Sequence, residues 1–459
     1  MRYLVGLVLA GVLVVCGLYV YAGGQPGPAI EIAKPTKYVG QSTPLEVAVT
    51  APGARFSVLE IVFEQNGKQT PLVSLAQPAS AEIKQEGADR VRVTKTIGRD
   101  AIPDLKSGPA RILVTAERGV MFGMRKARSS ASHDVQVRLE KPSIAVLSTK
   151  HYINLGGSEM VVYRATPADV ESGVQVGDLT YPGFPASGAT LEGVHIADPA
   201  VKIAFIALRY DQDVNTPMHA YAKDEAGNAA RADFDRLTFP KPFKKSRIEL
   251  DDAFLNRVIP AILETTNEVN PQGDILQKFL VVNGELRKKN ADKIASMAGQ
   301  TAPEILWGGA VFHPFTNTAV EAAFADRRTY VYQGKEVDGQ THLGFDLARV
   351  VHSPVVAANA GKVLYAAPLG IYGNCVILDH GMGVQSLYGH LSSFAVQAGQ
   401  MVQKEQELGK SGMTGMAGGD HLHFTMLVNG QMVNPVEWWD AHWIQDRILR
   451  KLHEASGGS

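Results

Sequence analysis

The sequence predicts a multidomain, mainly β protein that begins with an apolar transmembrane helix. Three observations predict this class. The chain has 459 residues, which is too long for one ordinary domain. Short runs with alternating apolar residues recur between residues 28 and 245, as expected of strands with one buried face. Residues 3–22 form an uncharged apolar run that is long enough to cross a bilayer as a helix.

The overall composition is that of a globular protein, with 45% hydrophobic and 20% charged residues. The formal net charge is −1, so the chain has no general basic field for nucleic acid, and we expect no nucleic-acid partner. The two cysteines, Cys16 and Cys375, lie in very different surroundings. We therefore expect no disulfide framework.

Residues 1–24 are interpreted as a membrane anchor or a signal peptide. The apolar run is long for a signal peptide, which favours an uncleaved anchor. Val20-Tyr21-Ala22 offers a small-residue cleavage site, so cleavage remains the alternative. Either interpretation places the remainder of the chain outside the cytoplasm.

Residues 28–140 and 141–245 are each predicted to form an immunoglobulin-like β-sandwich. Asn66-Gly67 between two apolar runs indicates a β-hairpin, and Lys141-Pro142 separates two segments of similar pattern. Neither segment carries a constellation of chemically active side chains. We expect both modules to act as spacers or as binding surfaces for other envelope proteins.

Residues 248–300 are predicted to be a helical linker. Apolar residues recur at helical spacing, Asp251 or Asp252 is a plausible N-cap, and Pro260 predicts a kink or a break. Two basic runs, "KPFKKSR" (241–247) and "RKKNADK" (287–293), accompany this segment. Solvated faces are the simplest interpretation of these runs, and contact with anionic envelope polymers or lipid is the alternative.

From residue 301 the chain is β-rich and glycine-rich, and nine of its thirteen histidines lie there. In "HLHFTMLV" (421–428) the side chains of a strand alternate, so His421 and His423 share one face while the opposite face is apolar. By itself this pattern favours a polar strand face over a metal site.

Two further motifs support a metal site. In "THLGFDLA" (341–348) an extended chain places His342, Gly344 and Asp346 on one face, and Gly344 leaves room for an ion between its neighbours. "SLYGHLSSF" (386–394) adds His390 after another predicted strand. Two imidazoles and one carboxylate suit a catalytic zinc ion, which keeps one position open.

Taken together, H-x-x-x-D at 342–346, Y-x-H-L at 388–391 and H-L-H-F at 421–424 resemble the lysostaphin/LytM-type zinc endopeptidases of bacterial cell walls. The resemblance covers residues 305–436, under a third of the chain. Supporting stretches are "FADRRTY" (324–330), "AANAGKV" (357–363), "YGNCVILDHGMG" (372–383), "AGQMVQKEQELGKSGMTG" (398–415) and "VNP" (433–435). One departure is Asp326, where members often carry glycine, and we expect it at the edge of the groove.

The resemblance implies that residues 301–440 form an antiparallel β-rich metallopeptidase domain with one Zn²⁺ ion. His342, Asp346 and His423 would ligate the ion, whereas His390 and His421 would be catalytic without ligating it. The implied reaction is hydrolysis of peptide bonds in the stem peptides or crosslinks of peptidoglycan during cell-wall remodelling. A non-catalytic regulator or activator of a cell-wall amidase is the alternative.

The same resemblance places the protein in the cell envelope. It would lie on the periplasmic side of the bacterial inner membrane, held by the N-terminal helix, or it would be exported. The stretch after Asn434-Pro435 is predicted to be helical and contains Trp438, Trp439 and Trp443, with residues 441–459 as a C-terminal helical tail. Packing against the catalytic domain is the favoured role of this tail, with membrane or glycan contact as the alternative.

Overall fold

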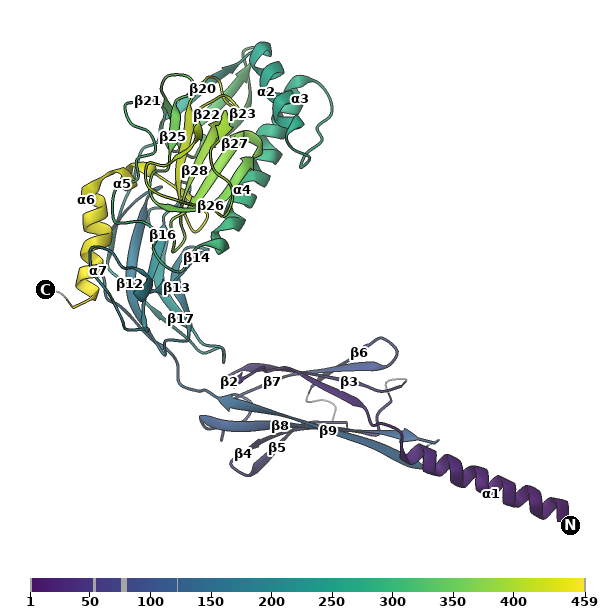
Figure 1. Cartoon of the computed structure of the whole chain (residues 1–459). Coiled ribbons are helices and arrows are strands. Elements are labelled where there is room, and N and C mark those ends of the chain that lie inside the picture. Colours follow the sequence, from purple (N-terminus) through teal and green to yellow (C-terminus); the bar gives the residue numbers. More distant parts are fainter. Residues whose placement is uncertain (1, 53–54, 76–80, 122, 458–459) are drawn as a thin grey trace. The chain divides into compact units, whose positions relative to one another are not determined.

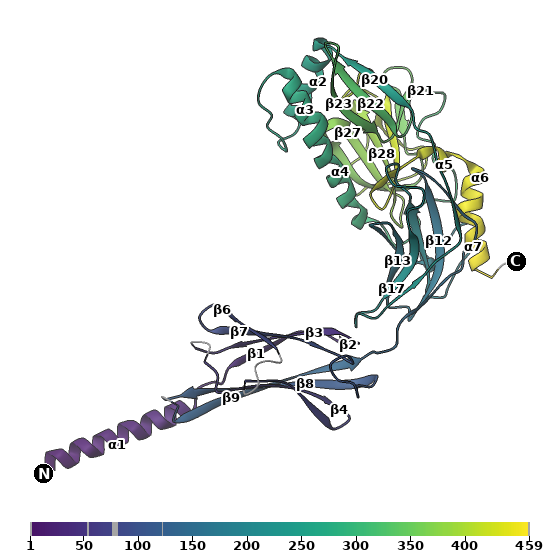
Figure 2. The same ribbon diagram turned by 180° about the vertical axis from the view of Figure 1, so that it is seen from behind.

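The computed structural model describes residues 2–52, 55–75, 81–121 and 123–457, and it confirms the mainly β class with one long apolar helix at the N-terminus (Figures 1 and 2). Residue contacts divide the chain into two compact units. The first unit comprises Met1–Pro142 and Lys223–Ala230, and the second comprises Ser143–Ala222 and Arg231–Ser459.

The N-terminal helix α1 spans Arg2–Gly23. Its described side chains from Gly6 to Tyr21 are exposed, although nearly all of them are apolar. Within the described residues, the stretch Gly6–Gly23 is long and apolar enough to cross a membrane. Apolar side chains exposed on every face of a helix fit a lipid environment better than water.

The first unit contains two facing sheets with one shared core. One sheet has the order β1-β3-β7-β6 and the other β2-β9-β8-β4-β5. Val47 and Val93 from the first sheet are fully buried together with Ile61 and Val114 from the second. The bounds are β1 (Ala29–Lys34), β2 (Tyr38–Val39), β3 (Thr43–Thr50), β4 (Val58–Gln65), β5 (Lys68–Ser74), β6 (Glu82–Glu86), β7 (Arg90–Ile97), β8 (Gly108–Val120) and β9 (Arg125–Val137).

The predicted hairpin at Asn66-Gly67 is present between β4 and β5. Asn66 has φ 52° and Gly67 has φ 78°, the two positive values that a tight type I′ hairpin turn requires. An immunoglobulin-like strand order remains a prediction for both β modules.

The second unit opens with another pair of sheets, ordered β10-β12-β16-β15 and β14-β13-β17-β18, and with a parallel pair β11-β19. Their bounds are β10 (Ser143–Val146), β11 (His151–Asn154), β12 (Ser158–Thr166), β13 (Glu171–Val176), β14 (Leu179–Pro182), β15 (Phe184–Pro185), β16 (Val201–Ala207), β17 (Met218–Lys223), β18 (Ala229–Ala232) and β19 (Arg236–Phe239). The core of this module continues without interruption into the C-terminal part of the chain.

The helical segment forms as predicted, with one difference. It consists of α2 (Asp252–Glu264), α3 (Ile275–Val281), the π-helical turn η4 (Val282–Leu286), α4 (Arg287–Ser296) and the 3₁₀ turn η5 (Met297–Gln300). Asp251 is the N-cap of α2, and its carboxylate accepts from the Phe254 N–H at 2.7 Å. Of the kink or break expected at Pro260, the break is wrong, because α2 continues to Glu264, and a kink stays a prediction. Its buried apolar face, which includes Ile259 and Ile262, holds the helix on the neighbouring sheet.

The C-terminal part is built on a large sheet of order β21-β24-β32-β28-β27-β26-β30, with β33 paired to β32. Two small sheets, β20-β22-β23 and β25-β31-β29, flank it. The bounds are β20 (Lys245–Leu250), β21 (Ala319–Ala322), β22 (Asp326–Tyr332), β23 (Lys335–His342), β24 (Phe345–Ala348), β25 (Pro354–Val356), β26 (Gly361–Pro368), β27 (Asn374–Asp379), β28 (Val384–Leu391), β29 (Ser393–Phe394), β30 (Met401–Val402), β31 (Glu407–Lys410), β32 (Leu422–Val428) and β33 (Gln431–Val433).

The large sheet is covered on both faces. Helices α2 to α4 lie along one face in both views (Figures 1 and 2), where Leu387 and Leu427 share a core with Leu255 and Phe279. Side chains of the opposite face, such as Phe424, belong to the core shared with the preceding β module. Burial on two sides explains why the central strands are apolar on both faces.

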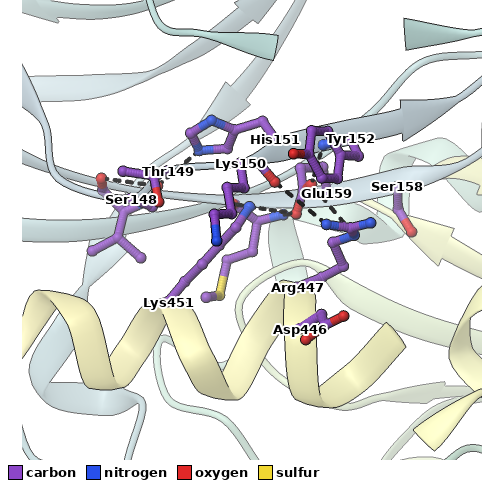
Figure 3. A network of polar contacts seen from close by, with 12 residues as sticks. Ser148, Thr149, Lys150, His151, Tyr152, Ser158, Glu159, Asp446, Arg447 and Lys451 are labelled. Carbon is purple, nitrogen blue, oxygen red and sulfur yellow. Dashed lines mark hydrogen bonds and ion pairs between the residues drawn. The ribbon is translucent and has the colours of Figure 1, made fainter. Parts of the chain in front are cut away.

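The chain ends in a helical tail that docks on strand β12. The tail comprises α5 (Pro435–Trp439), α6 (Ala441–Ile444), the π-helical turn η7 (Gln445–Leu449) and α7 (Arg450–Ala455). Figure 3 shows Lys451 and Arg447 pointing from the tail toward Glu159 of β12. Lys451 Nζ lies 2.7 Å from Glu159 Oε1, and both side chains are completely buried.

The tryptophans of this region pack inside the protein. Trp438 is fully buried and its Nε1 donates to Ser158 Oγ at 3.0 Å, while Trp443 is 9% exposed. Glu437 accepts from the Ser158 N–H at 2.7 Å and from Asn154 Nδ2 at 2.9 Å. The tail therefore packs against the protein, but these contacts are with the preceding β module, whereas the prediction named the catalytic domain as its partner.

Candidate active site

His342 and Asp346 lie at the junction of two sheets. Strand β23 ends at His342 and β24 begins at Phe345, so the expected continuous extended strand through Gly344 is wrong. Strand β23 pairs with β22, whereas β24 pairs with β21 and β32, and the chain changes sheet at Leu343–Gly344. The turn still brings His342 Nε2 to 2.9 Å from Asp346 Oδ1.

His423 joins this pair from β32. It lies directly opposite Asp346 in the antiparallel β24–β32 pairing. Its Nδ1 is 3.0 Å from Asp346 Oδ1 and 3.0 Å from His342 Nε2. The three side chains that the sequence predicts as ligands therefore converge on a triangle of one nitrogen or oxygen atom each.

Gly344 makes this convergence possible in a way that the sequence pattern does not show. A β-carbon at position 344 would lie 2.5 Å from Cε1 and Nε2 of His423. The missing side chain therefore makes room for the imidazole of His423, whereas the sequence predicted room for an ion. Any larger residue at this position would displace the ring.

The hydrogen bonds around the triangle fit a metal ion. His342 Nδ1 donates to the carbonyl oxygen of Ala323 at 3.1 Å, which fixes the tautomer whose Nε2 lone pair faces the triangle. His423 presents Nδ1 to the triangle, and its buried Nε2 has no partner among the described residues. Two imidazole nitrogens and one carboxylate oxygen, about 3 Å apart, suit one small divalent cation with an open position.

The electrostatics keep these groups in metal-binding forms. Burial alone would raise the pKa of Asp346, but His342 and the hydrogen-bonding imidazoles around the carboxyl hold it well below its usual range. Burial lowers the pKa of His423 to about 4, despite the opposing effect of Asp346. A carboxylate and a neutral imidazole are the protonation states in which these side chains ligate metals.

Arg328 holds the other oxygen of the Asp346 carboxylate, a contact that sequence reasoning missed. Its Nη2 donates to Asp346 Oδ2 at 3.1 Å, which leaves Oδ1 for the triangle. Asp326 lies two residues earlier on β22, with Oδ2 at 3.7 Å from Arg328 Nε. Asp326 and Arg328 are two residues apart and therefore share one face of a strand, and this spacing could have indicated their contact from the sequence.

The prediction that Asp326 lies at the edge of a groove is wrong. It is 2% exposed, and its two carboxylate oxygens share the single hydroxyl donor of Ser246, whose Oγ lies 2.8 Å from Oδ2 and 2.9 Å from Oδ1. Strand β20, which carries Ser246, runs parallel beside β22 and covers this carboxylate. Asp326 therefore supports Arg328 from within the protein.

His390 and His421 lie beside the triangle without being part of it. Their ring centroids are 4.8 Å apart, and the ring of His390 is 5.8 Å from that of His423. His390 Nδ1 donates to the Thr414 carbonyl at 2.8 Å, and His421 Nδ1 donates to the Gly419 carbonyl at 2.9 Å. In each ring Nε2 therefore remains available, and that of His421 lies 3.5 Å from Asp346 Oδ1.

The surroundings of His390 and His421 push their pKa values in opposite directions. Burial, together with the neighbouring imidazoles of His421 and His423, lowers the pKa of His390 well below its usual range. Burial also opposes the charged form of His421, but the carboxylate of Asp346 raises its pKa overall. Opposite shifts in neighbouring groups are typical of a proton donor and a proton acceptor.

The strand that carries His423 is buried on both faces, although alternation alone suggested a polar face. All residues of β32 are buried, including Thr425. The helical segment covers the histidine-bearing side and binds the surrounding loops. Arg257 Nη2 donates to the Ala417 carbonyl at 3.1 Å, and Asn290 Oδ1 accepts from the Ile371 N–H at 3.0 Å.

The C-terminal part of the chain matches a known family. Residues 340–435 match the model of "Peptidase family M23". A DD-carboxypeptidase/endopeptidase named Mpg from Neisseria meningitidis serogroup B is 36% identical over 129 residues, which are 28% of this chain and 29% of the relative. Peptidoglycan DD-endopeptidase ShyA from Vibrio cholerae is 36% identical over 96 residues, 21% of this chain and 22% of the relative.

Among solved structures, the catalytic domain of lysostaphin from Staphylococcus simulans is 28% identical and has a TM-score of 0.23, covering 26% of this chain and 90% of that domain. The chain covers less than a third of the length of Mpg and of ShyA. The segment matched by the family model contains His342, Asp346 and His423. The C-terminal part of the chain, residues 340–435, is a peptidase family M23 domain.

Proposed function

We propose that this protein is a zinc-dependent endopeptidase that hydrolyses peptide bonds in the stem peptides or crosslinks of peptidoglycan. The observation that carries the proposal is the triangle of His342 Nε2, Asp346 Oδ1 and His423 Nδ1, with two further imidazoles beside it. The match to peptidase family M23 supports hydrolysis, and the names of relatives such as peptidoglycan DD-endopeptidase ShyA support the substrate class.

Three side chains hold the metal in this proposal. His342 contributes Nε2, His423 contributes Nδ1 and Asp346 contributes Oδ1. When bound, zinc supplies Lewis acidity, which polarises a substrate carbonyl and lowers the pKa of a water molecule. Arg328 acts through Asp346, because its hydrogen bond to Oδ2 fixes the orientation of the carboxylate.

In this proposal the Nε2 atoms of His390 and His421 accept and release protons. Both rings are oriented by hydrogen bonds from Nδ1 to backbone carbonyl groups, so Nε2 of each ring is the atom available for exchange with water or with the leaving amine. No glutamate adjoins either ligand motif, which leaves these imidazoles as the groups placed for general acid–base catalysis.

The proposal extends to the location of the enzyme. Helix α1 anchors the chain in the bacterial inner membrane, and the folded units lie on the periplasmic side. The two β modules space the peptidase domain from the membrane or bind other envelope proteins. Peptidoglycan is the substrate that such a position offers to a peptidase.

The test uses the purified full chain in detergent with isolated peptidoglycan sacculi. Mass analysis of the released muropeptides is expected to show products whose peptides are cut, and His390→Ala is expected to abolish their release while retaining zinc. A chain that binds one zinc ion but releases no muropeptide would contradict the proposed activity. It would favour the non-catalytic regulator of an amidase.

A further inference from the structure

We propose that a basic pocket beside the metal triangle binds a free carboxylate of the acidic peptide substrate and thereby selects peptides that carry this group near the scissile bond. This inference rests on the proposed function, because it assigns a substrate feature to the same site. The pocket has a volume of about 670 Å³. It is formed by the helical segment, strands β20, β22 and β23, and Tyr210.

The charge of this pocket has one sign. Its lining includes five cationic side chains, and no acidic residue is among the described residues that line it. The five are Lys245, Arg287, Lys288, Arg327 and Arg328. Lys245 comes from the first basic run of the sequence, Arg287 and Lys288 from the second, and Arg327 and Arg328 from β22. The second run and β22 lie about 40 and 80 residues after the first run in the sequence, and the cationic residues of all three segments line the same pocket. A concave site with one sign of charge concentrates ligands of the opposite sign.

Three of these cations have no ion pair within the described structure. Arg328 is paired with Asp346 at 3.1 Å, and Lys288 is paired with Asp292 at 2.7 Å. No carboxylate of the described residues forms an ion pair with Lys245, Arg287 or Arg327. The pocket therefore carries about three uncompensated positive charges.

Two of the uncompensated charges face each other across neighbouring strands. Lys245 of β20 is the register partner of Arg327 of β22, and both side chains are exposed. Like charges directly opposite each other on neighbouring strands repel. An anion bound between them converts this repulsion into attraction.

Arg287 is held in place before any ligand arrives. Its Nη2 and Nε donate to Asn283 Oδ1 at 2.6 and 3.2 Å, and the Asn283 amide in turn donates to Asp338 Oδ2 at 2.7 Å. The neutral amide of Asn283 orients the guanidinium without compensating its positive charge. A planar guanidinium with fixed orientation recognises carboxylates with little loss of entropy.

The pocket adjoins the proposed catalytic centre. Arg328 lines it and also contacts the ligand Asp346, and Thr341 and Leu343 line it on either side of the ligand His342 in the chain. In this proposal, a peptide whose scissile bond lies at the triangle extends past Arg328 and places a neighbouring residue at the pocket. This position favours a carboxylate of the substrate peptide over a separate phosphate-bearing polymer as the occupant.

The test measures binding of soluble muropeptides, prepared from sacculi with a glycan-cleaving muramidase, to the zinc-loaded full chain in detergent. The muropeptides are used with free carboxylates and after chemical amidation, and His390→Ala is the background so that no turnover occurs. Lys245→Gln combined with Arg327→Gln is expected to weaken binding of the free-carboxylate form roughly tenfold, the loss of one charge-assisted hydrogen bond. Binding of the amidated form is expected to be weak and unchanged by these substitutions.

Two matched variants control for general charge and folding. Lys244→Gln removes the same charge from the residue next to Lys245, which does not line the pocket, and is expected to bind like the parent. Arg327→Lys keeps the charge and is expected to retain most of the affinity. Equal binding of free and amidated muropeptides, or equal losses in Lys244→Gln and the double variant, would overturn the inference.

Phosphate is the competing ligand chemistry. If inorganic phosphate or vesicles of anionic phospholipid bind in a way that depends on Arg327 while muropeptides do not, the carboxylate assignment is wrong. The binding readout is independent of hydrolysis, so it separates this inference from the proposed function. In the hydrolytic chain, the double variant is expected to raise KM and to leave kcat unchanged.

Discussion

The buried ion pair between Lys451 and Glu159 is expected to hold the helical tail on strand β12, and Lys451→Met tests this. Both side chains have no exposed area, and Lys451 Nζ lies 2.7 Å from Glu159 Oε1 and 2.9 Å from the Met160 carbonyl. Removing one partner of a buried pair costs about 3–5 kcal/mol, because the other charge stays buried. Glu159 keeps backbone donors from Tyr152 and Met160, so we expect the lower end, about 3 kcal/mol.

The assay is denaturant unfolding followed by tryptophan fluorescence. All four tryptophans lie after residue 300, and Trp438 and Trp443 belong to the tail itself, so the signal reports the second unit. The double variant Glu159→Gln with Lys451→Met removes both charges and is expected to recover part of the lost stability. The reasoning would be refuted if Lys451→Met were within 1 kcal/mol of the parent, or if the double variant lost the sum of the single losses.

Three further outcomes are expected. Burial raises the pKa of Glu437 to about 7, so the folded state keeps a proton that the unfolded state releases above about pH 4.5. The free energy of unfolding should therefore fall by about 3 kcal/mol between pH 4.5 and pH 7. In unfolding measurements at pH 5 and 7.5, Glu437→Gln should reduce this pH dependence. Gly344→Ala places a methyl group 2.5 Å from the His423 ring and should reduce zinc content measured after dialysis, whereas Gly339→Ala, where the nearest atom is 3.8 Å away, should not. Arg328→Ala frees Asp346 Oδ2 and should weaken zinc binding about tenfold to 100-fold in competition with a chelator, with unchanged affinity as the contradicting result.

Local patterns predict much of the fold and of the candidate site. Alternation placed His423 on a strand, capping placed the start of α2 at Asp251, and Asn66-Gly67 marked a hairpin. These features depend on a few neighbouring residues, which a sequence displays directly.

The features that the sequence did not predict depend on segments that meet only in three dimensions. The extended segment is interrupted at Gly344 because β23 and β24 pair in different sheets. Position 344 requires glycine because the ring of His423, 79 positions later in the sequence, lies against it. Asp326 is buried because β20 lies beside β22, and β32 is covered on both faces because the helical segment packs there. The pocket at Arg327 likewise joins basic runs that appear unrelated in the sequence.

The central claim is that His342, Asp346 and His423 hold the metal while His421 moves protons. The most direct test is zinc content and muropeptide release measured side by side for His423→Ala and His421→Ala, with the folded state of each checked by its unfolding transition. His423→Ala is expected to lose both zinc and activity, whereas His421→Ala is expected to lose activity and to retain close to one zinc ion per chain. Equal zinc loss in the two variants, or full activity in His423→Ala, would contradict this division of roles.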